Sequence, residues 1–268
     1  MHFIGIDPHK DTLAACAVDP HGRAVSQASF PNDPAGSVPA AVLRAAGWLA
    51  GEQATAPSSE MRRRLWASLG VAMDMVSSTV LVLGVTLVGD SPLAVSLAAH
   101  AAAGVPMRVT LGQLVHHVER AELCGPRRVW ACENPSVVEA AADRLGARCG
   151  PLVCTEGRSS VAACRLLAGL TRAGTELRYH GDFDWAGLDI AAGVFLLGGL
   201  PWRLTAAEYR SGVAEAKVAL PQLAVRRSAL GEWDHELVAE MEHCGRQLEE
   251  EHVIDTLLAD MTQDSSSG

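Results

Sequence analysis

Short apolar runs alternate with longer segments of helical periodicity between residues 127 and 200. The apolar runs have the length of strands and the segments between them have the length of helices. Strands separated by helices form βαβ units, in which the strands are parallel and the crossovers right-handed. The pattern therefore predicts an α/β fold with strands over 128–133, 151–155 and 176–181 and helices over 136–145, 159–173 and 188–197.

The chain before residue 125 contains elements of different kinds. Residues 1–36 read as a small β meander, with strands over 2–6, 12–18 and 24–30. A further strand begins near Val76, and Gly-Asp-Ser-Pro then caps a helix that runs to Ala103. A strand over 107–110 and a helix through Glu122 complete this part.

These patterns divide the chain into five parts. Gly, Ser, Pro and Ala dominate residues 37–60, which is typical of a linker. Residues 230–261 form an acidic amphipathic helical end, in which we expect Glu249–Glu251 on a solvated face and Leu257 and Leu258 packed on the sheet. The expected parts are a meander at 1–36, a linker at 37–60, the remnant of a preceding α/β region at 61–124, the α/β domain at 125–261 and a disordered tail at 262–268.

Composition limits the class of protein. Of the 268 residues 49% are hydrophobic, which excludes a mainly disordered chain. The net charge of −9 argues against a surface that binds nucleic acid unaided, although cations or a partner could neutralise an acidic nuclease site locally. Seven cysteines without a C-x-x-C pair indicate reduced thiols. The polar N-terminus and the interrupted apolar run over 76–88 indicate a soluble, cytoplasmic protein.

Three carboxylates are expected at one edge of the predicted sheet. Asp182 and Asp184 follow one strand at a spacing that projects both side chains to the same side, and Glu133 ends another strand. The carboxyl ends of parallel strands meet at one edge, where sites of open α/β sheets lie. Clustered carboxylate oxygens are the ligands that Mg²⁺ prefers. We therefore expect a metal site at this edge, with Glu156 in the turn after 151–155 as a further candidate ligand.

Longer motifs surround these carboxylates. They are Cys-Glu-Asn-Pro-Ser-Val-Val at 132–138, Cys-Thr-Glu-Gly at 154–157, Tyr-His-Gly-Asp-Phe-Asp-Trp at 179–185 and Pro-Trp-Arg at 201–203. Over residues 62–260 the chain resembles the topoisomerase-six-A-like Toprim family encoded beside SMC-like ATPases. That family is akin to JetD, the nuclease subunit of the Wadjet anti-plasmid system. The resemblance implies a Toprim-like parallel sheet with flanking helices.

The resemblance also implies a function. Glu133, Asp182 and Asp184 would bind Mg²⁺ or Mn²⁺ and hydrolyse DNA phosphodiesters in partnership with an SMC-like ATPase complex. Two metals could serve, or one metal with Glu133 as general base. Arg203 and the pair Arg226 and Arg227 are the candidates for contacts to the DNA backbone, with ordinary surface charge as the alternative.

Cleavage through a covalent tyrosine intermediate is not favoured by the sequence. Relatives that cut by transesterification need a tyrosine on a domain upstream of the Toprim part. The chain has two tyrosines, Tyr179 within a predicted strand and Tyr209 on a predicted downstream helix. Hydrolysis is the chemistry that remains.

The first 36 residues carry a second resemblance. Gly-Ile-Asp-Pro-His-Lys at 5–10 is similar to the start of DEDD transposases of the Piv type, in which the aspartate, here Asp7, is a metal ligand. Because the remaining strands and acidic residues of that fold do not follow, we interpret this segment as a vestigial fragment. Two alternatives to a nuclease therefore remain, a non-catalytic truncated relic or interaction protein and a DEDD transposase fragment.

Overall fold

The computed structural model describes residues 75–118, 123–224 and 233–262, together with the backbone of three strands near the N-terminus. The chain divides into two compact units, Met1–Met75 and Val76–Gly268. Expectations for 37–60, for Arg226 and Arg227, and for the end of the chain beyond 262 lie outside the described residues.

The N-terminal unit contains an antiparallel sheet of three strands in the order β1-β2-β3. Neighbouring strands are joined in sequence order, with Phe3 opposite Val18 in the first pair and Thr12 opposite Pro31 in the second. The predicted meander is confirmed. The strands are β1 (Phe3–Pro8), β2 (Thr12–Val18) and β3 (Ala24–Pro31).

The second unit is built on a six-stranded sheet in the order β5-β4-β7-β6-β8-β9. Strands β7, β6, β8 and β9 are parallel neighbours, which confirms the predicted βαβ arrangement. The strands are β4 (Thr79–Leu83), β5 (Met107–Thr110), β6 (Arg128–Cys132), β7 (Leu152–Cys154), β8 (Glu176–Tyr179) and β9 (Leu200–Pro201).

Strand β4 makes the sheet mixed rather than wholly parallel. It pairs antiparallel with both β5 and β7. The sequence pattern predicted the strand but not its direction. A run of apolar residues looks the same whether the strand runs parallel or antiparallel to its neighbours. Strands β4 and β5 come from the part expected to precede the α/β domain, yet they lie in the same sheet as β6 to β9.

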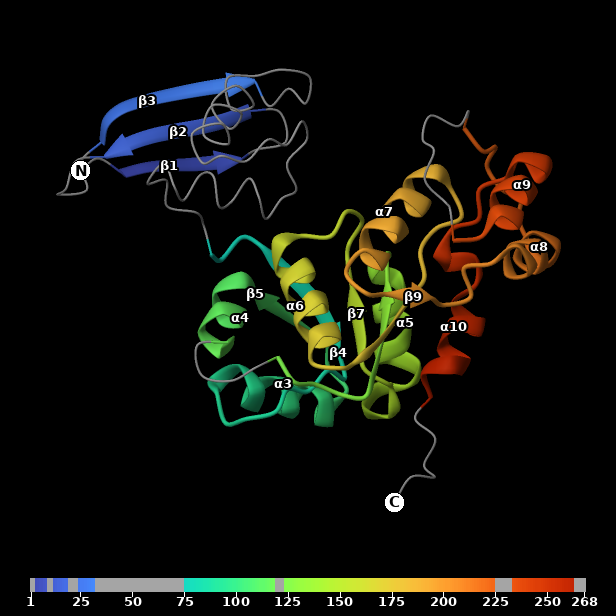
Figure 1. Ribbon diagram of the computed structural model, residues 1–268, viewed down its shortest axis with the longest axis horizontal. Helices are drawn as coiled ribbons and strands as arrows, with labels where there is room; N and C mark the ends of the chain where they lie inside the picture. Colours follow the sequence, from blue (N-terminus) through green and yellow to red (C-terminus); the bar gives the residue numbers. More distant parts are fainter. Residues whose placement is uncertain are drawn as a thin grey trace. The chain divides into compact units, whose positions relative to one another are not determined.

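Helices flank this sheet (Figure 1). Several of them are preceded by an N-cap residue whose side chain accepts a hydrogen bond from a backbone N–H of the first turn. Ser91 has this role, as predicted, and so do Asn134 and Ser160. The helices are α3 (Pro92–Ala103), α4 (Leu111–Val118), α5 (Pro135–Arg144), α6 (Val161–Arg172), α7 (Trp185–Phe195), α8 (Ala206–Glu215), α9 (His235–Cys244) and α10 (Ile254–Met261), with single turns η1 (Gly146–Arg148) and η2 (Glu250–His252).

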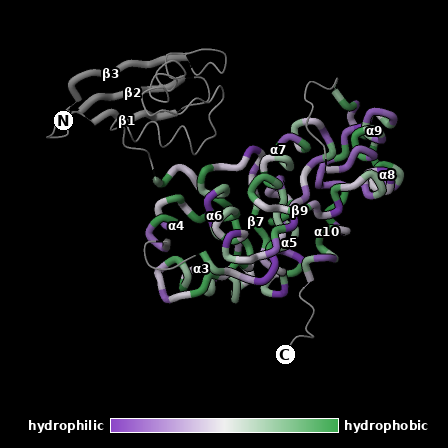
Figure 2. The backbone as a smooth tube through the Cα atoms, in the orientation of Figure 1, coloured by the Kyte–Doolittle hydropathy of each residue, from purple (hydrophilic) through white to green (hydrophobic). Residues whose placement is uncertain are grey.

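One cluster of the hydrophobic core forms where α5 and α10 cover the sheet. Leu257 and Leu258 of α10 are buried there, as predicted, and Trp130 packs against Trp202 with ring centroids 4.6 Å apart and the rings tilted by 41°. Figure 2 shows hydrophobic and hydrophilic stretches alternating along the helices, as expected of elements with one buried side. No helix of the described residues is both long and apolar enough to cross a membrane.

Strand β6 lies at the point where the strand order reverses. The chain leaves β6 through α5 to β7 on one side and then returns through α6 to β8 on the other side. Right-handed crossovers in opposite directions place α5 and α6 on opposite faces of the sheet. A crevice beyond the carboxyl ends of the strands is expected at such a reversal, and binding sites of open α/β sheets lie there.

Candidate functional site

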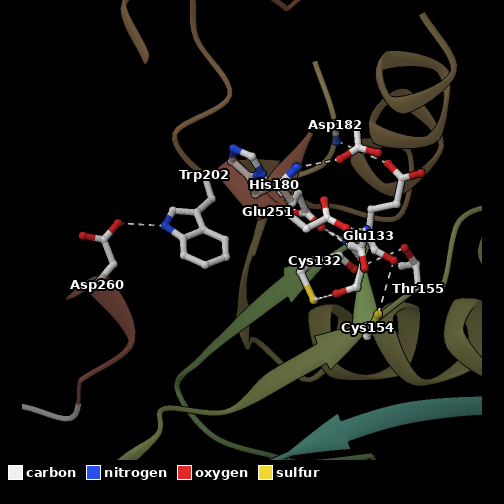
Figure 3. Close-up of polar contacts among 11 residues, drawn as sticks. Cys132, Glu133, Cys154, Thr155, His180, Asp182, Trp202, Glu251 and Asp260 are labelled. Carbon is white, nitrogen blue, oxygen red and sulfur yellow. Dashed lines mark hydrogen bonds and ion pairs between the residues drawn. The ribbon is translucent and has the colours of Figure 1, made fainter. Parts of the chain in front are cut away.

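Glu133 and Asp182 lie together at the strand-order reversal. Glu133 directly follows β6, and Asp182 lies in the loop after β8. Glu133 Oε2 accepts the Asp182 N–H at 3.4 Å, and Figure 3 shows the two carboxylates side by side. A Cβ added at Gly181 would lie 3.0 Å from the same oxygen, so a small residue is needed between β8 and Asp182. Of the three carboxylates expected to meet at this edge, the structure brings Glu133 and Asp182 together.

Burial makes both of these carboxylates unusually basic. Burial first, and then the negative charge of Asp182, raise the pKa of Glu133 from 4.5 to about 7. Burial and the neighbouring acidic groups likewise raise the pKa of Asp182 from 3.8 to about 6, although the Glu250 N–H opposes this change. Strongly shifted pKa values of this kind are common at acid–base sites.

Asp184 lies close to this pair but has a structural hydrogen bond of its own. Its Oδ1 accepts the N–H of Gly187 at 2.7 Å and caps the N-terminus of α7. Its charge still raises the pKa values of Glu133 and Asp182. Of the two aspartates in the D-x-D motif, Asp182 is therefore the one that adjoins Glu133, and Asp184 begins the following helix.

Glu250 is a central residue of the site that the sequence did not indicate. The prediction of a solvated face over Glu249–Glu251 is wrong for this residue, whose exposed fraction is 0%. Its Oε2 accepts the N–H groups of Glu133 at 3.0 Å and Asn134 at 2.6 Å, and its own N–H donates to Asp182 Oδ1 at 2.8 Å. Glu249 and Glu251 are exposed, as predicted.

His180 lies beneath the loop in contact with Glu250. Its Nδ1 is 3.1 Å from Glu250 Oε1, and both residues are buried. Burial lowers the pKa of His180 to about 4 and raises the pKa of Glu250 to about 8. Burial therefore favours the uncharged form of both groups, and the two side chains share one hydrogen bond.

Glu156, the further candidate ligand, forms an ion pair. Its two oxygens accept from Arg108 Nη1 and Nη2, each at 2.6 Å, in a bidentate arrangement. Its φ of 55° is unusual for a residue other than glycine. The positive charge of Arg108 therefore compensates this carboxylate locally.

Arg203, the described candidate for DNA contact, is held by acidic residues. Its guanidinium donates to Asp260 at 2.5 and 2.8 Å and to Glu208 at 2.9 Å. These pairs raise its pKa. The arrangement joins the segment after β9 to α8 and α10, which is a structural role for this side chain.

Both tyrosines of the chain are buried. Tyr179 in β8 and Tyr209 in α8 have exposed fractions of 0%, and the Tyr209 hydroxyl donates to the Arg246 carbonyl at 2.7 Å. Burial is the main cause that raises the pKa of each hydroxyl. Both hydroxyls are therefore inaccessible to solvent in this conformation.

Two protein families match parts of the chain. Residues 107–261, more than half of it, match the family described as Protein of unknown function C-terminus (DUF2399). The chain belongs to the DUF2399 family. Residues 33–87 match the family described as Protein of unknown function N-terminus (DUF3323). No curated protein matches the chain.

The two matches meet within one sheet. The DUF2399 match begins at β5 and includes Glu133, Asp182 and Glu250, whereas β4 falls within the DUF3323 match. Because β4 lies between β5 and β7, the sheet of this DUF2399 member is completed by a strand from the preceding match. The meander at 1–31 precedes both matches.

The carboxylates provide two converging oxygen donors for a cation. Within 75–118, 123–224 and 233–262, no group of three His, Cys, Asp or Glu side chains has an arrangement that could hold a metal ion. Glu133 and Asp182 nevertheless fit a divalent cation chemically, because the negative charge of Asp182 raises the pKa of Glu133 and carboxylate oxygens suit Mg²⁺ and Mn²⁺. Of the predicted triad, the structure of this DUF2399 member therefore brings Glu133 and Asp182 together, whereas Asp184 caps α7.

The raised pKa values give an expected pH dependence of stability. The folded pKa values of Glu133 and Glu250, about 7 and about 8, exceed their ordinary value of 4.5. The folded protein therefore binds more protons than the unfolded chain in this range, and its stability falls as pH rises. His180 acts in the opposite direction, mainly below about pH 7, because its folded pKa of about 4 lies below its ordinary value of 6.5. Between pH 6.5 and 8, without divalent cations, we expect the free energy of unfolding to fall by about 2 kcal/mol.

Urea denaturation at a series of pH values measures this decline. Glu250→Gln removes one of the titrating groups and is expected to flatten it. A stability that stays constant or increases between pH 6.5 and 8 would contradict the raised pKa values of the buried carboxyls.

Arg203→Ala is expected to lower stability. The substitution removes partly exposed ion pairs to Asp260 and Glu208, for which we expect a loss of about 1–2 kcal/mol in the free energy of unfolding. Arg210→Ala is a suitable control, because Arg210 is more exposed and its nitrogen lies 3.5 Å from Glu240. Chemical denaturation should show little change in the control; equal effects of the two substitutions would contradict a structural role for Arg203.

Proposed function

We propose that this chain is a metal-dependent DNA phosphodiesterase, the Toprim nuclease-like subunit of an SMC-associated plasmid-defence system. The observation that carries the proposal is the meeting of Glu133 and Asp182 at the strand-order reversal, with pKa values raised to about 7 and about 6. The motifs around these residues, which resemble the Toprim family akin to JetD, give the substrate class and the partner complex.

The residues of the site suit hydrolysis. A divalent cation such as Mg²⁺ or Mn²⁺, when bound, would lower the pKa of an attacking water and stabilise the charge on the leaving oxygen. Asp182 Oδ1 accepts the Glu250 N–H, and Glu133 Oε2 accepts the Asp182 N–H, so hydrogen bonds restrain both carboxylates. Glu133 can also accept a proton near neutral pH, as a general base must. Either role of Glu133 is compatible with this geometry.

The acidic character of the chain supports dependence on a partner. The net charge is −9, and Arg203 is held by Asp260 and Glu208. A complex that includes the SMC-like ATPase would supply phosphate contacts that this chain provides poorly. Assays with and without the ATPase complex test this part of the proposal.

Plasmid cleavage tests the activity itself. The full chain, alone and with the ATPase complex, is incubated with supercoiled plasmid and Mn²⁺ or Mg²⁺. We expect nicked or linear product that chelation by EDTA abolishes. Product that persists in EDTA would reject metal-dependent hydrolysis, and the absence of cleavage in the full complex would reject the nuclease function.

A non-catalytic interaction protein is the second candidate. It is favoured by the capping role of Asp184 and by the absence of a three-ligand group among the described side chains. This candidate predicts association with the ATPase complex without cleavage and without an effect of Glu133 substitutions. The plasmid assay therefore distinguishes the two candidates.

A further inference from the structure

Glu250 connects the two segments that carry the site carboxylates. One of its oxygens accepts the N–H groups of Glu133 and Asn134, and its own N–H donates to Asp182 Oδ1. Its second oxygen contacts His180, which precedes Asp182 by two residues. A single buried side chain, together with its backbone, therefore contacts both the β6 end and the loop after β8.

A backbone bridge next to Glu250 fixes how the C-terminal segment is aligned with the D-x-D loop. Phe183 and Leu248 form an isolated antiparallel bridge, in which the Phe183 N–H donates to the Leu248 carbonyl at 2.9 Å and the reverse bond is 3.4 Å long. Both residues are buried. The segment from Leu248 to Glu250 thus lies along the D-x-D loop and cannot slide without breaking these bonds.

We propose that Glu250 is a positioning residue, which fixes the relative placement of the Glu133 and Asp182 carboxylates by binding both segments. The positional role follows from the hydrogen bonds alone, and its consequence for cation binding rests on the proposed function. Glu250 belongs to the C-terminal segment, 117 residues from Glu133 in sequence. The site is therefore complete only when this segment is docked on the sheet.

Substitutions of Glu250 that differ in length and in hydrogen-bonding groups distinguish the positioning role from a role of its acidic group alone. In Glu250→Gln the amide oxygen can accept the Glu133 and Asn134 N–H groups, and the amide nitrogen can donate to His180 Nδ1. Glu250→Asp keeps the carboxyl but is one methylene too short to reach both segments. Glu250→Ala leaves two buried N–H groups without their acceptor.

Asp234 provides a matched control, because its carboxylate also accepts backbone N–H groups from two different segments. Asp234 Oδ1 accepts the Leu237 N–H at 3.0 Å and its Oδ2 accepts the Ala206 N–H at 3.2 Å, so it also joins two segments. These segments belong to α8 and α9 and do not carry the site carboxylates. Asp234→Ala is therefore expected to lower stability without a change at the site.

Hydrogen exchange measured by mass spectrometry on the full chain tests the positional role without any cation. In Glu250→Ala and Glu250→Asp we expect amides of both 131–136 and 180–184 to exchange at least about tenfold faster than in the wild type. Glu250→Gln should restore slow exchange, and Asp234→Ala should leave both segments unchanged. Folded Ala and Asp variants with wild-type exchange in 180–184 would overturn the proposal.

Mn²⁺ titration then tests the consequence for the proposed function. Where the wild type binds Mn²⁺, Glu250→Ala and Glu250→Asp are expected to bind it about 10–100-fold more weakly, as for other residues that orient metal ligands, and Glu250→Gln within about threefold. Unchanged affinity in the folded Ala and Asp variants would overturn the proposal. A wild type that binds no Mn²⁺ would reject the proposed metal centre, and the exchange result alone would then decide the positional role.

Discussion

Replacing Glu133 with glutamine is expected to abolish metal-dependent cleavage while making the protein more stable. A carboxylate that binds the cation or takes up the proton stabilises the transition state. Its loss is expected to raise the activation free energy by several kcal/mol, which corresponds to about a thousandfold lower rate. The amide oxygen of glutamine can still accept the Asp182 N–H, so the loop is preserved. Plasmid cleavage measured with a fixed excess of Mn²⁺ gives the rate.

The gain in stability follows from the electrostatics of the site. At pH 8 the folded protein carries Glu133 ionised beside Asp182, although burial disfavours that charge. Removing the charge is expected to raise the free energy of unfolding by about 1 kcal/mol, a value reduced for screening by solvent. Glu139→Gln, an exposed position on α5, makes the same change in net charge and is expected to alter neither property. Wild-type cleavage by Glu133→Gln would contradict the assignment of the site.

Gly187→Ala is expected to disrupt the D-x-D loop. A Cβ at this position would lie 2.2 Å from the carbonyl oxygen of Asp182, which is a backbone atom and cannot turn away. The loop or α7 must therefore move, and we expect a loss of about 3 kcal/mol in the free energy of unfolding together with loss of cleavage. Thermal unfolding and plasmid cleavage measure the two effects.

Gly193→Ala provides the control on the same helix. No atom lies within 4 Å of a Cβ placed at Gly193, so alanine meets open space there. Because alanine favours helix more than glycine does, we expect this variant to be more stable by about 0.5–1 kcal/mol and fully active. If Gly187→Ala behaved like Gly193→Ala, the close contact between α7 and the Asp182 carbonyl would be wrong.

The sequence predicted those features that depend on neighbouring residues. The strand over 107–110, the cap at Ser91 and the alternation between residues 128 and 195 could be read from local patterns. The convergence of Glu133 and Asp182 also followed, because the parallel order of strands places their carboxyl ends at one edge. Hydrophobic periodicity and capping act over a few residues, so a single sequence contains them.

Features that depend on distant contacts could not be predicted in the same way. The burial of Glu250 depends on N–H groups of Glu133 and Asn134, more than a hundred residues away, and its neighbours Glu249 and Glu251 are exposed. A run of three glutamates alone favours solvent, and only the interruption of the helical pattern between α9 and α10 distinguishes this place. Asp184 is also an N-cap residue type in front of a predicted helix, so its capping role agrees with the sequence. The D-x-D spacing alone does not distinguish this role from that of a metal ligand.

Calorimetric titration of Mn²⁺ into the full chain at pH 6.5, in buffers of different ionisation enthalpy, tests the central claim most directly. Because the pKa of Glu133 is about 7, a cation bound at Glu133 and Asp182 must displace protons. The site predicts saturable binding with proton release that falls as pH rises to 8.5, and loss of binding in Glu133→Gln. The absence of saturable Mn²⁺ binding, or binding that Glu133→Gln leaves unchanged, would contradict a cation site between these two carboxylates.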